Sequence, residues 1–84
     1  MNIDAAIAEL QKRIKAASPN AVVRIRKRSE EEASIRAYAP ATDESAIKAA
    51  TADMTLNLLT EQGLDVQVLV YDIATSLPPE QAHA

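Results

Sequence analysis

The sequence predicts an α+β domain, a two-layer sandwich of order α-β-β-α-β with two helices packed on one face of a three-stranded mixed sheet. Two observations predict the elements: apolar residues recur every three to four positions over residues 3–17 and 43–62, and alternate over 21–28, 33–39 and 64–73. The length of the chain is a third observation and predicts the number of domains, because 84 residues support one domain. We expect that domain to span residues 1–73, followed by a flexible C-terminal tail over residues 74–84.

The first helix is predicted over residues 3–17. Its expected buried stripe is Ile3, Ile7, Leu10 and Ile14. Asn2 or Asp4 can cap its start, because both side chains accept hydrogen bonds from free backbone N–H groups. Pro19 ends the helix, since proline supplies no N–H and disfavours helical angles at Ser18.

Two strands, over residues 21–28 and 33–39, are joined by the short polar link 29–32 and predict a β-hairpin. Two pairings are open. A five-residue connection would place Arg26 opposite Arg36, and a three-residue connection would place Arg24 opposite Arg36. Either pairing brings arginines together, which costs energy unless anions approach.

The second helix is predicted to start near Thr42, a candidate N-cap, and to end at Gly63, the only glycine, in a left-handed C-cap. Its expected buried stripe is Ile47, Ala50, Met54 and Leu58, widened by Leu56 and Leu59. Residues 49–53 are less periodic, so a break into two shorter helices stays open.

The third strand, over residues 64–73, should lie parallel to the second through a right-handed crossover. The sheet face expected beneath the helices takes Val23, Ile25, Ile35, Ala37, Val66, Val68 and Val70. Asp72 shares this inward parity. We expect it to reach water at the frayed end of the strand, and an ion pair with Lys27 is the alternative for a buried Asp72.

The opposite sheet face has no further helix to cover it, and it is the candidate binding site. The candidate residues are Arg24, Arg26, Arg28, Arg36, Tyr38, Leu69 and Tyr71. Arginine and tyrosine are enriched at interface hot spots, and an uncovered face with large aliphatic side chains is typical of an interface. We predict binding of another protein or of a second copy of the chain as a homodimer.

Single-stranded RNA is the alternative partner, with bases stacked on Tyr38 and Tyr71 and arginines on phosphates. The net charge of −3 argues against it, although residues 1–36 hold eight of the nine basic residues. A third interpretation is a solvated face whose arginines pair with Glu30, Glu31 and Glu32.

The element order over residues 3–73 resembles type II KH-like domains, including the ribosome-binding-factor and BolA groups. The resemblance carries no motif, because Gly63 stands alone and no GxxG loop exists, and residues 49–53 would have to form the inter-helix turn. It implies RNA binding or association with the ribosome, which belongs to the alternative function.

Composition argues against an enzyme. The chain has no cysteine, and its one histidine, His83, falls in the predicted tail, so we expect no catalytic residue, metal site or cofactor. No apolar run approaches the roughly 20 residues of a membrane helix, and the N-terminus does not resemble a signal peptide. We therefore expect a cytoplasmic protein that does not bind membranes.

Overall fold

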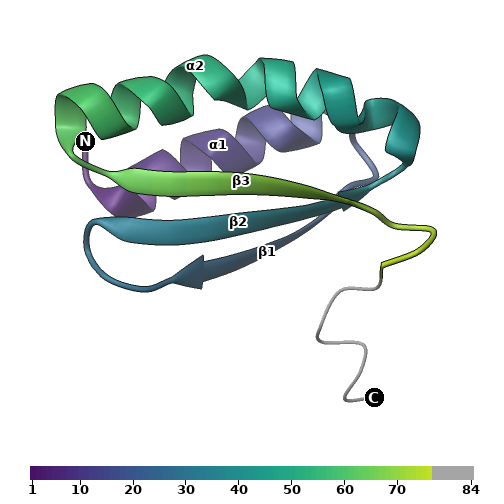
Figure 1. The fold of residues 1–84 in the computed structure, drawn as a ribbon, viewed down its shortest axis with the longest axis horizontal. Coiled ribbons are helices and arrows are strands. Elements are labelled where there is room, and N and C mark those ends of the chain that lie inside the picture. The colour runs from purple at the N-terminus through teal and green to yellow at the C-terminus, as the bar shows by residue number, and fades with distance from the viewer. Residues whose placement is uncertain (77–84) are drawn as a thin grey trace.

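Two helices lie on one face of a three-stranded sheet, as Figure 1 shows, in a computed structural model that describes residues 1–76. The elements follow the predicted order: α1 (Ile3–Ala17), β1 (Val22–Lys27), β2 (Glu32–Ala39), a 3-10 turn η1 (Ala41–Asp43), α2 (Glu44–Gln62) and β3 (Asp65–Asp72). The predicted α+β class is confirmed. Of the predicted tail, residues 77–84 lie outside the described residues, and so does His83.

The sheet has the order β1-β2-β3, with β2 in the centre. β1 pairs with β2 antiparallel and β3 pairs with β2 parallel, so β1 and β3 are edge strands. α2 packs along β3 and against α1, and α1 packs on β2. Within residues 1–76 neither helix combines the length and hydrophobicity that a membrane span requires.

α1 forms as its sequence predicts. The Oδ1 of Asn2 accepts a hydrogen bond from the Ala5 N–H at 2.8 Å, so Asn2 is the N-cap. All four residues of the predicted stripe are buried: Ile3, Ile7, Leu10 and Ile14. At the other end the buried Ser18 hydroxyl donates to Asp43 at 2.7 Å, which joins the end of α1 to the segment before α2.

The start of α2 differs from the prediction. Thr42 is not its N-cap, because residues 41–43 form the η1 turn and the helix begins at Glu44. Asp43 precedes the helix but makes no side-chain cap, since it accepts from Ser18 instead. This tertiary contact competes with local capping and could not be found in a local pattern.

α2 is one continuous helix. The Thr51 hydroxyl is buried and donates to the Ile47 carbonyl at 2.9 Å, so the polar group is satisfied within the helix and no break is needed. The inter-helix turn that a KH-like layout needs at residues 49–53 is therefore not formed. Gly63 ends the helix with φ 68°, which confirms the left-handed C-cap.

The predicted width of the α2 stripe is wrong. Leu56 and Leu59 are 59% and 53% exposed, and they do not join the core. The buried positions are Ile47, Thr51, Met54 and Leu58. These steps of four, three and four residues make a single narrow stripe on α2. Leu56 and Leu59 fall outside this stripe, on the side of α2 next to the outer edge of β3.

At the sheet edges one expectation is wrong, and the alternative pairing of Asp72 is not formed. Ile25 is 41% exposed, because the helices pack mainly over β2 and β3 and leave the edge strand β1 less covered. Lys27 does not pair with Asp72, since β1 and β3 lie on opposite edges of the sheet. Instead the Lys27 ammonium lies 3.0 Å from Glu30 and 3.3 Å from Asp4. Hydrogen bonds to Glu30 and then to Asp4 raise the pKa of Lys27.

Replacing Gly63 with alanine should lower the free energy of unfolding by about 1 kcal/mol, measured by urea denaturation. A Cβ at this position would meet no atom within 4 Å, so the cost comes from the left-handed backbone and not from a clash. Gly63→Asn should cost less, because asparagine tolerates this conformation better. Equal losses for both variants would contradict this explanation.

Candidate functional site

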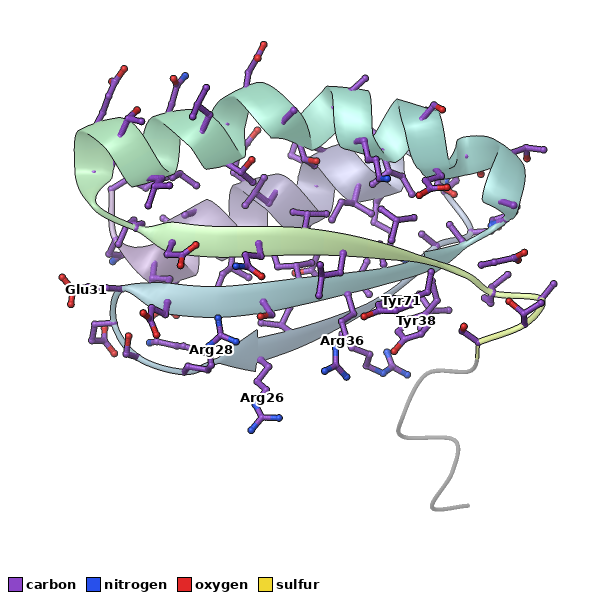
Figure 2. The ribbon with its side chains drawn as sticks, viewed as in Figure 1. Arg26, Arg28, Glu31, Arg36, Tyr38 and Tyr71 are labelled. Atoms are coloured by element: carbon purple, nitrogen blue, oxygen red, sulfur yellow. The ribbon has the colours of Figure 1, made fainter. Side chains whose placement is uncertain are left out.

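The sheet face that points away from the helices, here called the open face, consists of four rows of side chains across the strands. The rows follow from the strand register: Val22–Tyr38–Tyr71, Arg24–Arg36–Leu69, Arg26–Ser34–Gln67 and, at the hairpin end, the acidic pair Glu32–Asp65. Arg28 follows β1 at the hairpin. Figure 2 shows the arginines that it labels, Arg26, Arg28 and Arg36, pointing away from the helices. The structure therefore brings all the sequence-predicted site residues to one side.

Tyr38 and Tyr71 face each other across β2 and β3 (Figure 2). Their rings are stacked, with centroids 5.2 Å apart and planes at 21°. Tyr38 is only 4% exposed, whereas Tyr71 is partly exposed. The pair therefore forms a fixed aromatic platform at one end of the open face, and Tyr71 is the ring that a partner can reach.

The hairpin selects one of the two arginine pairings left open by the sequence. Arg24 lies opposite Arg36, as the three-residue connection predicts. The N–H groups of Arg28 and Ser29 both donate to the Glu32 carbonyl, at 2.9 and 3.2 Å, and close the turn. Two cationic side chains thus sit side by side in one row, next to Leu69.

The hairpin glutamates make no ion pair with three of the open-face arginines, although Glu32 and Asp65 place two carboxylates on the same face. Within residues 1–76, Arg26, Arg28 and Arg36 form no ion pair with any acidic side chain. Glu30 pairs with Lys27, and Figure 2 shows Glu31 at the hairpin end, pointing outward from the sheet. The solvated-face interpretation therefore lacks the ion pairs on which it depended.

Arg36 is held in the centre of the face at a cost to stability. Its Nε is buried and has no hydrogen-bond partner among the described residues. An unsatisfied buried donor costs about 1–3 kcal/mol, and a like charge directly opposite adds up to about 1 kcal/mol. A buried donor without a partner calls for an explanation, and this makes Arg36 a candidate binding residue of the open face.

Among residues 1–76 no group of three or more histidine, cysteine, aspartate or glutamate side chains is arranged to hold a metal ion. What the open face offers is guanidinium N–H donors beside an aromatic ring and a leucine. That combination can bind carboxylates or phosphates next to apolar or aromatic groups.

One surface feature was not predicted. A groove runs between α2 and the outer edge of β3, and its walls include Lys48, Leu56, Leu59, Asp65 and Val68. The sequence did contain a signal for it, because the two leucines do not fit the four-three-four spacing of the buried stripe on α2.

Comparison of the chain with protein-family models, with curated proteins and with solved structures finds no significant match. Function is therefore argued from the geometry and chemistry of the surfaces described above.

Replacing Arg36 with methionine should raise the free energy of unfolding by about 1 kcal/mol, measured by urea denaturation. Methionine keeps an unbranched apolar stem but removes the buried Nε and the charge opposite Arg24. The matched control is Arg26→Met, opposite Ser34 on an exposed edge position, which should change stability by less than about 0.5 kcal/mol. A clear loss of stability for Arg36→Met would show that this arginine supports the fold.

Proposed function

We propose that this protein is a cytoplasmic, non-enzymatic binding module whose open face takes an acidic segment of another protein. One observation carries the proposal: Arg26, Arg28 and Arg36 lie on the same face as Leu69 and Tyr71 and have no acidic ion-pair partner within residues 1–76. Carboxylates of a partner would supply the missing charge, and Leu69 and Tyr71 would supply the apolar contact.

The chemistry of the face favours a different chain over a second copy at this surface. Stacking two open faces around a two-fold axis would bring the arginines of one copy toward those of the other. Like charges held together in a desolvated interface cost several kcal/mol. An acidic segment avoids this repulsion and also benefits from electrostatic steering.

Single-stranded RNA is the second candidate, supported by the same unpaired arginines and by the exposed ring of Tyr71. The stacked geometry weakens it relative to a protein partner. Because Tyr71 covers Tyr38, the open face offers one stacking position for a base where the sequence suggested two.

The proposal predicts salt-sensitive binding of acidic peptides. The probe is a fluorescent peptide of alternating glutamate and leucine residues, titrated with the full chain and followed by anisotropy. Arg26→Glu/Arg36→Glu should weaken binding by about tenfold or more, because each change turns an attraction into a repulsion. The control Lys12→Glu/Lys15→Glu makes the same charge change on α1, which lies on the other face, and should have a much smaller effect.

A uridine-rich oligonucleotide, titrated in the same way, separates the two candidates. Oligonucleotide binding that is lost with Tyr71→Ala, together with no peptide binding at low salt, would replace the protein-partner proposal with the RNA one. Absence of binding to either probe at low salt would reject the open face as an anion-binding surface.

A further inference from the structure

The open face changes in character along its strands. Its first row, at the Tyr71 end, is uncharged, and the next two rows carry Arg36 and Arg26. The fourth row, at the hairpin end, holds Glu32 and Asp65 side by side. A segment that lies along the strands therefore meets an apolar surface first, then a cationic surface and finally an acidic one.

The two carboxylates of the fourth row are available to a partner. Glu32 is exposed and Asp65 is partly exposed, and within residues 1–76 neither forms an ion pair. The Arg28 N–H donates to the Glu32 carbonyl at 2.9 Å, but no ion pair joins their side chains. Like charges on neighbouring strands are destabilising, and a cation between these carboxylates would relieve their repulsion.

The rows are spaced to fit an extended segment. Residues two apart in a strand point to the same face and lie about 6.6 Å apart, because each residue advances the chain by about 3.3 Å. An extended partner segment advances by the same amount. When such a segment lies along the strands, its alternate side chains can therefore each contact one row.

Building on the proposed function, we infer that the partner of the open face is an extended segment with side chains in a fixed order. At alternate positions it carries an apolar or aromatic residue, two acidic residues and one basic residue. The apolar residue contacts Tyr71, and the acidic residues lie over the rows of Arg36 and Arg26. The basic residue lies over Glu32 and Asp65 and supplies the charge that their row lacks.

The acidic row also excludes competing partners. A run of glutamates long enough to cover the face would bring a negative charge to Glu32 and Asp65, and so would the backbone of a single-stranded nucleic acid. Like charges brought together at an interface suppress the wrong partner. The order of charges therefore separates the inferred partner from a uniformly acidic one.

The test compares two fluorescent peptides by anisotropy with the full chain at low salt. Both carry phenylalanine, glutamate and glutamate at alternate positions separated by serine, and the fourth alternate position is lysine in one and glutamate in the other. The lysine peptide should bind about fivefold tighter or more, because it replaces a repulsion at the fourth row with an attraction.

A third peptide controls for net charge. It has the composition of the lysine peptide, but the lysine precedes the phenylalanine and so falls beyond the first row. Its affinity should be lower than that of the lysine peptide, since it keeps the charge and loses the contact with the fourth row.

A charge reversal in the protein identifies the row that reads the basic residue. Glu32→Lys/Asp65→Lys should invert the preference, so that the glutamate peptide binds more tightly than the lysine peptide. The control Asp53→Lys/Glu61→Lys makes the same charge change at exposed positions of α2 and should keep the preference for lysine. Far-ultraviolet circular dichroism checks that each variant is folded.

The outcomes separate this inference from the proposed function. Equal binding of the three peptides, or tighter binding of the glutamate peptide by the unmodified chain, would overturn the inference and leave an acidic partner in place. A preference for lysine that survives Glu32→Lys/Asp65→Lys would also overturn it. Absence of binding to every peptide at low salt would reject the proposed function and the inference together.

Discussion

A sheet has two faces, and two helices packed side by side can cover only one of them. The helix layer covers the central strand best, so Ile35 and Ala37 are fully buried while Ile25 on the edge strand is not. With no third helix among the described residues, the other face must be stabilised by its own side chains. The stacked Tyr38–Tyr71 pair is the main contact available there, and it fixes one end of that face.

Because the helices cover only one face of the sheet, the arginines on the other face bear on what that face does. On the helix side of the central strand β2, alanines and an isoleucine contact the helices. The alternate positions of β2, Ser34, Arg36 and Tyr38, lie on the open face. A guanidinium whose Nε is buried without a partner, opposite another arginine, is a poor choice for stability alone.

The open face and the groove beside β3 differ in physical character, and Leu69 borders both of them. The open face is cationic and aromatic, which suits a partner of opposite charge. The β3 edge is uncharged over residues 66–71 and adjoins exposed leucines, which suits backbone pairing and apolar burial.

Periodicity by itself determined the order of elements, the α1 stripe, the Gly63 cap and the face on which each arginine lies, because these depend on spacing along the chain. Spacing does not say how far a helix layer extends or which strand lies at an edge. Only the tertiary structure showed that Leu56 and Leu59 lie outside the core and that Asp43 accepts a hydrogen bond from Ser18. It also identified the carboxylates that pair with Lys27 and the register that sets Arg24 opposite Arg36. The contacts of Asp43 with Ser18 and of Lys27 with Asp4 join residues distant in sequence, which no local pattern encodes.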